Sequence, residues 1–184
     1  HDIPPKAKNI IEQYVKRGGY VYCPKVYKGK VWKYDVNQAY AAAMRDCDMP
    51  AGLCLHTVGN IDLSKIKTPY FAKVTAHNPN NIIPFYIKND VNGKPSASFA
   101  MYDIYECWLS NVEIEQLYNE KWDITVYEIY RFTESFNLSD YVNHLEKLRT
   151  TCAGGTKGAI GTMVKATGNH SFGKTLQEIG EKEY

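Results

Sequence analysis

The alternation of apolar and polar side chains in residues 122–132 constrains the fold of this chain more than any other feature. This segment, WDITVYEIYRF, has the period of two that is typical of a half-buried β-strand. A helix is predicted on each side of it, one over residues 109–121 and one that begins with Ser139 as its N-cap. The first helix opens with Ser110 and Glu113, which have the spacing of a capping box. The mixture of strands and helices predicts an α+β fold.

Further segments add helices and strands on both sides of this region. Residues 6–17 and 37–46 have helical periodicity, whereas residues 30–36, KVWKYDV, are predicted to form a short strand. Short apolar runs separated by Pro, Asn and Gly predict a β-rich insertion that begins near Met49. After the Gly154-Gly155 break the helical pattern returns over residues 156–177.

The composition excludes several classes of protein. Hydrophobic residues make up 44% of the chain and charged residues 23%, as in soluble globular proteins rather than disordered ones. No apolar run approaches the ~20 residues of a transmembrane helix, so no membrane partner is expected. Five cysteines without a Cys-x-x-Cys pair indicate reduced, structural thiols. A metal site formed by Cys47, Cys54 and His56 is a weakly supported alternative.

The net charge of +2 conceals an uneven distribution along the chain. Residues 1–33 carry eight Lys/Arg against two acids, and residues 147–175 carry five Lys/Arg and no acid. Residues 34–146 carry eight Lys/Arg against fifteen acids. Charge runs usually form solvated surface, but two basic ends also suit a polyanion such as a nucleic acid or a triphosphate.

Residues 168–175, GNHSFGKT, match the phosphate-binding pattern of P-loop NTPases. A P-loop follows a buried strand and opens a nucleotide-binding domain. The preceding residues, TKGAIGTMVKA, are not strand-like, and nine residues follow Thr175. We therefore expect this match not to mark a P-loop.

The same segment contains a second pattern. Lys165 and Asn169 are four residues apart and Phe172 follows three later, so a helix places all three on one face. A cation, an amide and a ring on one stripe suit a nucleoside triphosphate that lies across the helix, with the cation at the phosphates. A solvated helix face would have a similar pattern.

Four segments, in this order along the chain, resemble the motifs of one family. They are KRGGY at 16–20, YDVNQAYAAAM at 34–44, ECWLSNVEIEQL at 106–117 and KATGNHSFG at 165–173. They resemble the linker motif, the first catalytic motif, an insertion segment and the finger-helix motif of protein-primed family B DNA polymerases of phages and linear plasmids. The resemblance implies a partial palm sheet with packed helices, a β-rich insertion and two antiparallel finger helices.

The second of these motifs implies a metal site. Asp35 resembles the first metal-binding aspartate of the family, and the carbonyl group of Val36 resembles its backbone metal ligand. The family uses two Mg²⁺ ions, and one would be shared with residues outside this chain. Tyr40 resembles the aromatic residue that packs under the incoming sugar and excludes a 2′-hydroxyl. Taken alone, Asp35 could cap a helix and Tyr40 could belong to a core.

The finger-helix motif implies a nucleotide site. Lys165 resembles the triphosphate-binding lysine, Asn169 the asparagine near the base or sugar, and Phe172 the stacking tyrosine. Arg149 stands near the place of another phosphate-contacting cation.

Two further positions concern phosphate contacts. Arg17, Gly18 and Gly19 resemble the template-binding loop, in which glycines let backbone N–H groups approach phosphates. A simple helix stop is an equal alternative. Gly161 stands where a further lysine is expected, and Lys157 is a candidate replacement.

The resemblance divides the chain into the start of the palm (1–47), an insertion that resembles the region contacting the priming protein (48–140), and the fingers (141–184). The implied partners are a DNA template-primer, an incoming dNTP and a priming terminal protein. The implied location is the cytoplasm, that of the host if a phage encodes the chain. The second aspartate motif, Asp-Thr-Asp, is missing, so we expect the 184 residues alone not to polymerise DNA. A non-catalytic module that binds nucleic acid or protein is the alternative.

Overall fold

The computed structural model describes residues 3–16, 28–34, 39–59 and 61–176, with residues 172–176 described by their backbone alone. The chain divides into two compact units. Unit 1 comprises His1–Arg17 and Met49–Phe136, and unit 2 comprises Gly18–Asp48 and Asn137–Tyr184.

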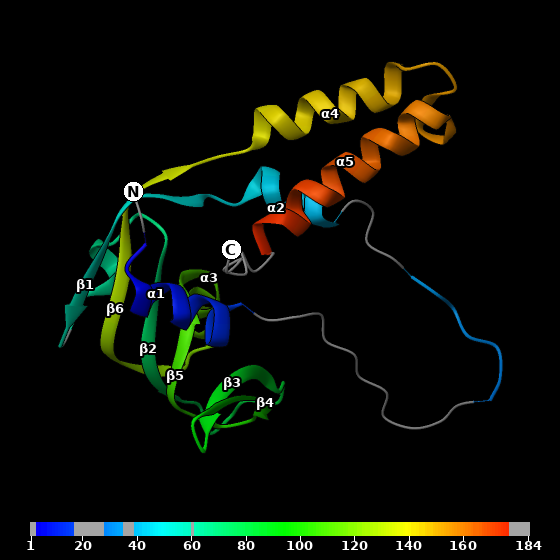
Figure 1. Cartoon of the computed structure of the whole chain (residues 1–184). Coiled ribbons are helices and arrows are strands. Elements are labelled where there is room, and N and C mark those ends of the chain that lie inside the picture. The colour runs from blue at the N-terminus through cyan, green and yellow to red at the C-terminus, as the bar shows by residue number, and fades with distance from the viewer. Residues whose placement is uncertain (1–2, 17–27, 35–38, 60, 177–184) are drawn as a thin grey trace. The chain divides into compact units, whose positions relative to one another are not determined.

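Unit 1 contains a four-stranded antiparallel sheet with the strand order β1-β6-β2-β5 (Figure 1). Its strands are β1 (Met49–Val58), β2 (Tyr70–His77), β5 (Asp103–Ser110) and β6 (Asp123–Phe136). A separate hairpin consists of β3 (Phe85–Val91) and β4 (Lys94–Ala100). The segment with the clearest alternation in the sequence forms β6, which pairs with both β1 and β2. The predicted α+β class is therefore confirmed.

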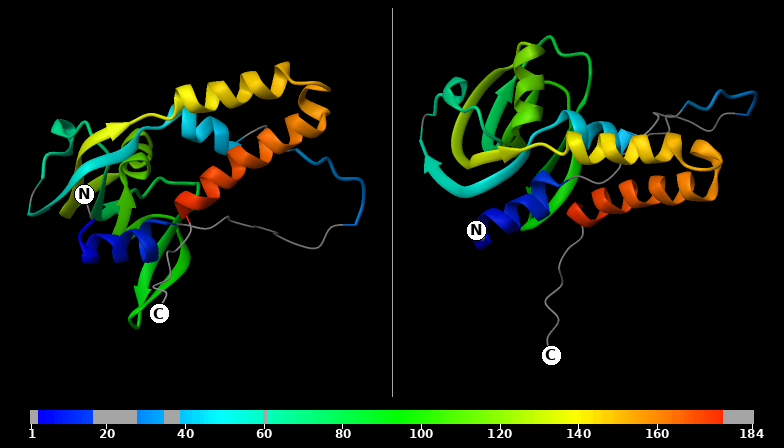
Figure 2. Two further views of the ribbon diagram at one scale, coloured as in Figure 1. Left: turned by 45° about the horizontal axis from the view of Figure 1, so that its top comes forward. Right: turned by 90° about the horizontal axis from the view of Figure 1, so that it is seen from above.

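Helices cover both faces of this sheet (Figure 2). The helix α3 (Asn111–Asn119) buries Ile114 and Leu117 in the main core, together with Ala72 of β2. On the other face, α1 (Pro5–Ile10) and the π-helical turn η1 (Ile11–Val15) pack on a second cluster that includes Phe71. Neighbouring strand residues point to opposite faces, so Phe71 and Ala72 belong to different clusters. A short helical turn, η2 (Leu63–Lys65), precedes β2.

The helix caps agree with the sequence at one helix and differ at another. At α3, the Ser110 hydroxyl accepts the backbone N–H of Glu113 and the Glu113 carboxylate accepts that of Ser110, so the predicted capping box is confirmed. The prediction that Ser139 caps the following helix is wrong. Ser139 is already helical, and its N–H donates to Oδ1 of Asn137 at 2.7 Å. Asn137 therefore satisfies this helix end from outside the helix.

The regular secondary structure in the described part of unit 2 is helical. It contains α2 (Ala39–Asp46), α4 (Ser139–Thr151), the short turn η3 (Gly155–Lys157) and α5 (Ala159–Leu176). The helices α4 and α5 run antiparallel as a hairpin, as the finger helices were expected to do (Figures 1 and 2). The backbone is helical throughout residues 168–175, which excludes a P-loop at this position.

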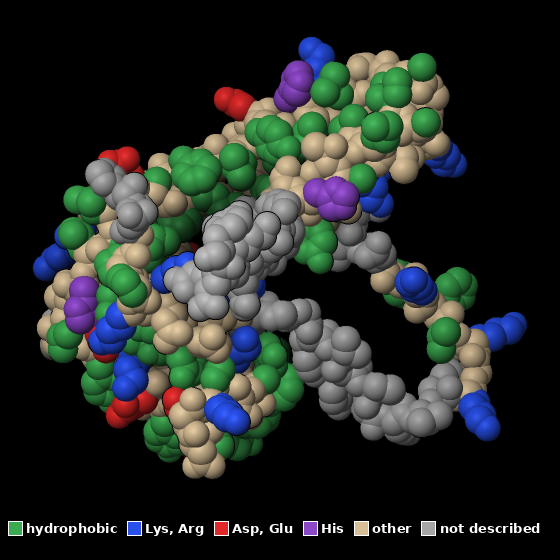
Figure 3. All heavy atoms as spheres, in the orientation of Figure 1, with side chains coloured by type: hydrophobic (Ala, Val, Ile, Leu, Met, Phe, Trp, Pro, Cys, Tyr) green, Lys and Arg blue, Asp and Glu red, His purple; other side chains and the backbone are tan. Residues whose placement is uncertain are grey.

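The strand predicted at residues 30–36 is not found in its described part. Residues 28–34 have no regular secondary structure, and Trp32 and Tyr34 are 87% and 88% exposed. The lysines of this segment are exposed as well (Figure 3). A strand needs a neighbour for its backbone N–H and C=O groups, and the described residues of unit 2 provide none.

No helix among the described residues combines the length and the apolar character that crossing a bilayer requires.

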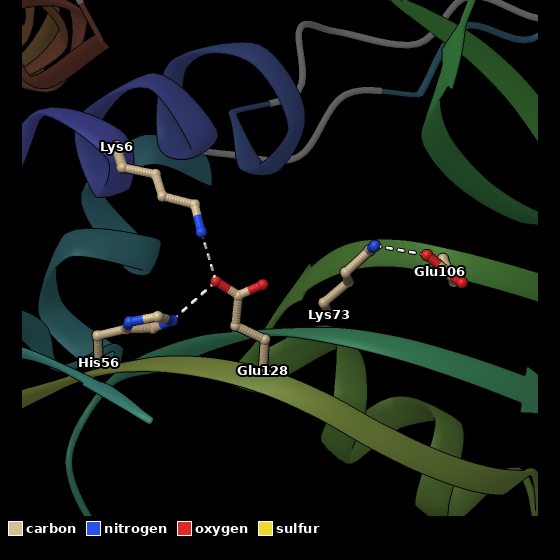
Figure 4. Close-up of polar contacts among 5 residues, drawn as sticks. All are labelled: Lys6, His56, Lys73, Glu106 and Glu128. Atoms are coloured by element: carbon tan, nitrogen blue, oxygen red, sulfur yellow. Dashed lines mark hydrogen bonds and ion pairs between the residues drawn. The ribbon is translucent and has the colours of Figure 1, made fainter. Parts of the chain in front are cut away.

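A charged cluster attaches α1 to the sheet of unit 1 (Figure 4). Oε1 of Glu128 on β6 lies 2.8 Å from Nζ of Lys6 and 2.7 Å from Nε2 of His56. The His56 ring stacks on Tyr130, with ring centroids 4.4 Å apart. Burial alone would raise the pKa of Glu128, but the hydrogen bonds from Lys6 and His56 outweigh it and lower the pKa. The carboxylate is thus held in its charged form.

We expect the Glu128→Gln variant to lower the free energy of unfolding of unit 1 by about 1–2 kcal/mol at pH 7, because charge-assisted hydrogen bonds to a half-buried group are lost. Because the pKa of Glu128 is lower in the folded state, its ionisation stabilises the fold at pH values above the pKa of the unfolded state. This stabilisation is lost as the pH falls through the pKa of the folded state. The wild type should therefore lose stability on acidification, and the variant should lose less. Urea unfolding of the 184-residue chain at pH 7 and pH 4 measures both.

The Glu106→Gln variant is the control. Glu106 pairs with Lys73 on the same sheet, but its side chain is 66% exposed (Figure 4). Exposed ion pairs contribute little. If both variants shift the unfolding curve equally, the Glu128 cluster has no special role.

Two glycines of unit 1 form a matched pair for a second test. Gly52 in the bulge of β1 and Gly93 in the β3–β4 turn have φ angles of 73° and 76°. A Cβ atom at Gly93 meets nothing within 4 Å, whereas one at Gly52 overlaps Oγ1 of Thr133. That hydroxyl also accepts the N–H of Leu53 at 2.8 Å.

We expect Gly93→Ala to destabilise unit 1 by about 1–2 kcal/mol, the strain of a left-handed alanine. Gly52→Ala should cost more, because the new methyl group also displaces the Thr133 hydroxyl from Leu53. Thermal unfolding of the two variants gives the comparison. Equal costs would mean that the overlap is relieved without loss of the hydrogen bond.

Candidate nucleotide-binding site

One pocket of unit 2 is lined by side chains from α2, α4 and α5. Its lining residues are Ala41, Met44, Val142, Leu145, Glu146, Arg149, Val164, Lys165, Gly168 and Asn169. The empty space within it is about 380 Å³, including the part that is open to solvent.

Three of the predicted nucleotide-binding residues meet in this pocket. Lys165 and Asn169 both line it from α5, as expected for residues four apart on one helix face. Arg149 lines it from the last turn of α4. The antiparallel hairpin therefore places the two cations and the amide on a common wall.

The guanidinium group of Arg149 has an unsatisfied donor. Its Nε atom is buried and has no hydrogen-bond partner among the described residues. A buried donor without an acceptor costs about 1–3 kcal/mol. An acceptor that enters the pocket, such as a phosphate oxygen, would remove this cost.

Glu146 is a pocket residue that the sequence did not single out. Its Oε2 atom lies 3.9 Å from Nη1 of Arg45 on α2, so its charge faces a cation of the neighbouring helix. Arg45 also donates to both carboxylate oxygens of Asp46, and this contact raises the pKa of Arg45 and lowers that of Asp46. Glu146 precedes Arg149 by three residues, so the two side chains share one face of α4. This spacing could have indicated that Glu146 lies near the predicted cation.

Comparison with known proteins identifies the family. The model for the family described as "DNA polymerase type B, organellar and viral" matches residues 3–184. The chain belongs to this family. No curated protein sequence matches it.

The fold is similar to that of Phi29 DNA polymerase. An orthorhombic crystal form matches with a TM-score of 0.69 and 20% identity, over 96% of this chain and 32% of that chain. A post-translocation binary complex with primer-template DNA matches with a TM-score of 0.61 and 21% identity, over 93% and 30%. A ternary complex with primer-template DNA and incoming nucleotide matches with 0.52 and 21%, over 76% and 25%. The chain thus spans about a third of the first of these polymerase chains.

The remaining predicted residues of this type B polymerase chain stand outside the pocket or outside the described residues. Tyr40 lies at the start of α2 and is 51% exposed. It directly precedes the pocket residue Ala41 in the sequence. Phe172 belongs to α5, and its side chain lies outside the description. Outside the described residues lie Arg17, Gly18, Gly19, Asp35 and Val36. Their roles stay predictions.

The alternative metal site has no support. No group of three or more His, Cys, Asp or Glu among the described residues could hold a metal ion. Cys47, Cys54, Cys107 and Cys152 are free thiols.

The structure gives a physical reason for a glycine at position 161, where the sequence analysis expected a lysine. Gly161 is buried under the turn between α4 and α5, and a Cβ atom there would overlap the carbonyl oxygen of Gly155. A lysine at 161 would require the turn to move. Lys157 lies in that turn, and its role as a replacement stays a prediction.

Gly161 and Gly168 allow a matched test of this close approach. A Cβ atom at Gly168 would lie 3.7 Å from Cδ1 of Leu145, an ordinary contact. Gly168→Ala should therefore stabilise the hairpin by about 0.5–1 kcal/mol through helix propensity, whereas Gly161→Ala should destabilise it. Urea unfolding, monitored by circular dichroism, measures the sign of each change in the free energy of unfolding. Stabilisation by both alanines would contradict the close approach at Gly161.

Proposed function

We propose that this chain is part of a protein-primed family B DNA polymerase and that the pocket of unit 2 receives the incoming dNTP. The reaction is nucleotidyl transfer during DNA replication. The observation that carries the proposal is the pocket that Arg149 lines together with Lys165 and Asn169, and the buried Nε of Arg149 has no hydrogen-bond partner among the described residues. Membership of the type B polymerase family supports it, as does the similarity to a Phi29 DNA polymerase complex with incoming nucleotide.

Each side chain has a distinct role in this proposal. The ammonium group of Lys165 and the guanidinium group of Arg149 bind phosphate oxygens, where their charges offset those of the triphosphate. Asn169 donates to or accepts from the base or sugar. Phe172, three residues later on α5, stacks on the nucleotide. Tyr40 packs under the sugar and excludes a 2′-hydroxyl.

Asp35 and the carbonyl group of Val36 would hold Mg²⁺. Both supply the hard oxygen ligands that this ion prefers, together with phosphate oxygens and water. When bound there, Mg²⁺ would supply Lewis-acid activation of the primer hydroxyl and offset the charge of the leaving pyrophosphate. A second carboxylate motif is needed for two ions, so we expect the 184 residues alone not to extend a primer.

The remaining parts of the proposal concern macromolecular partners. Arg17, Gly18 and Gly19 contact the template strand, and the insertion at residues 48–140 contacts the priming terminal protein. The Phi29 polymerase structures in complex with primer-template DNA support the first of these roles. The expected location is the cytoplasm, where replication of a phage or plasmid takes place.

The test is dNTP binding by the full-length polymerase. We expect Lys165→Ala and Arg149→Met each to raise the KM for dNTP about ten-fold or more, because each loses a charge-assisted contact of about 1.5–3 kcal/mol. The Kd for template-primer should change little. Steady-state primer extension and a DNA-binding assay separate the two quantities.

The control is Lys147→Ala. Lys147 is an exposed lysine of α4 that does not line the pocket, and its loss should leave the KM for dNTP unchanged. If Lys165→Ala leaves the KM for dNTP unchanged, as Lys147→Ala should, the pocket does not receive the triphosphate. That result would favour the alternative of a non-catalytic binding module.

A further inference from the structure

An acidic side chain lies at the pocket that is proposed to receive the triphosphate. Glu146 lines this pocket together with two cations, Arg149 and Lys165. Glu146 and Arg149 are three residues apart on α4, a spacing that places Cβ atoms about 5–6 Å from each other. A phosphate bound to the Arg149 guanidinium group is therefore close to the carboxylate. Like charges repel, so Glu146 opposes the binding that the two cations favour.

The Glu146 carboxylate has an ionic partner on a neighbouring helix. Its Oε2 atom lies 3.9 Å from Nη1 of Arg45 on α2, which is too long for a hydrogen bond. The side chains of Arg45 and Glu146 are 37% and 36% exposed. Ion pairs with this exposure contribute little to stability. The pair therefore orients the carboxylate toward α2, but stability does not explain why an acid stands at an anion site.

Arg45 is itself held by a second carboxylate. Its Nε donates to Oδ1 of Asp46 at 2.8 Å, and its Nη2 donates to Oδ2 at 3.1 Å. Two parallel bonds of this kind fix the plane of a guanidinium group. The remaining nitrogen, Nη1, is the one that faces Glu146. Asp46 thus fixes the position from which Arg45 attracts the pocket acid.

The apolar walls of the pocket strengthen the effect of each charge. The apolar residues of the lining are Ala41, Met44, Val142, Leu145 and Val164. Met44 and Val142 are each only 1% exposed. Charges interact more strongly beside such walls than in open solvent. One acidic group at this place therefore has a measurable effect on phosphate affinity.

We propose that Glu146 limits the affinity of this pocket for phosphate groups, and that Arg45 positions the Glu146 carboxylate away from the bound phosphates. Nucleotidyl transfer releases pyrophosphate, which consists of two of the three phosphates of the dNTP. Tighter binding of substrate and product alike does not speed the chemical step, and it delays product release. The proposal rests on the proposed function, in which the pocket receives the incoming dNTP.

The test is the Glu146→Gln variant of the full-length polymerase. Glutamine keeps the size of the side chain and removes its charge. We expect the Kd for dNTP and the inhibition constant of added pyrophosphate each to fall about three- to ten-fold, because the repulsion is lost. Added salt should reduce both changes, since the side chain is partly exposed. Nucleotide binding on a dideoxy-terminated primer gives the Kd, and primer extension gives the inhibition constant.

The Arg45→Met variant tests the positioning role. Without its partner on α2, the Glu146 carboxylate can turn toward Arg149 and Lys165 and compete with phosphate. The Kd for dNTP should therefore rise about three-fold or more. Adding Glu146→Gln to Arg45→Met should remove this rise, because Arg45 acts through Glu146. A rise that persists in the double variant would mean that Arg45 contacts the nucleotide directly, and the positioning role would fail.

The control is Asp140→Asn. Asp140 is an exposed acid in the first turn of the same helix and does not line the pocket. The loss of its charge should leave the Kd for dNTP and the inhibition constant of pyrophosphate unchanged. Thermal unfolding of every variant shows whether its fold is retained.

Three results for the main variant would overturn the proposal. If Lys165→Ala raises the Kd for dNTP but Glu146→Gln does not lower it, the acid does not limit phosphate affinity and the proposed function stands. If neither variant changes the Kd, the pocket does not receive the triphosphate and the proposed function fails as well. If Glu146→Gln raises the Kd and lowers the Tm, the carboxylate only stabilises the contact between α2 and α4.

Discussion

The pairing of β1 with β6 is the constraint on which both units depend. Met49, the first residue of β1, is the register partner of Phe136, the last residue of β6. The chain therefore leaves unit 2 after α2 and returns to it before α4 at neighbouring positions. Within unit 2, Nδ2 of Asn137 lies 3.4 Å from Oδ1 of Asp48, and α2 packs against α4. The strands and α3 of unit 1 are thus inserted between α2 and α4 in the sequence without separating these two helices, which line the pocket together with α5.

A second constraint acts inside the α4–α5 hairpin. Backbone atoms of the turn lie so close to Gly158, at the end of η3, and to Gly161, in α5, that neither position has room for a side chain. The turn joins α4 to α5, and Arg149 of α4 and Lys165 of α5 line the same pocket. Like charges in one pocket repel, and only Glu146 among the acids lines it. The arrangement is most favourable when an anion occupies the pocket, which agrees with a triphosphate site.

Local signals in the sequence predicted most elements, whereas contacts between distant segments were not predictable. The alternation of β6, the capping box of Ser110 and the helical pattern of α5 each depend on a few adjacent residues. The strand expected at 30–36 depends on a pairing partner that no local pattern reveals. The cluster of Lys6, His56 and Glu128 joins three segments whose adjacency follows only from strand order and register. The pocket was predictable in part. The sequence predicted that Lys165 and Asn169 share one face of α5, but it did not predict the contacts of the turn between α4 and α5.

The proposed catalytic carboxylate is tied to the pocket by a short covalent connection. Four peptide units separate Asp35 from Ala39, the first residue of α2, and n residues of chain span at most about 3.3–3.6 Å each. This helix itself contributes Ala41 and Met44 to the pocket. A nucleotide whose phosphates lie at Lys165 and Arg149 would have to extend toward the start of α2 to reach this carboxylate. Tyr40 stands at that end of the helix, half-exposed, where a sugar would pass.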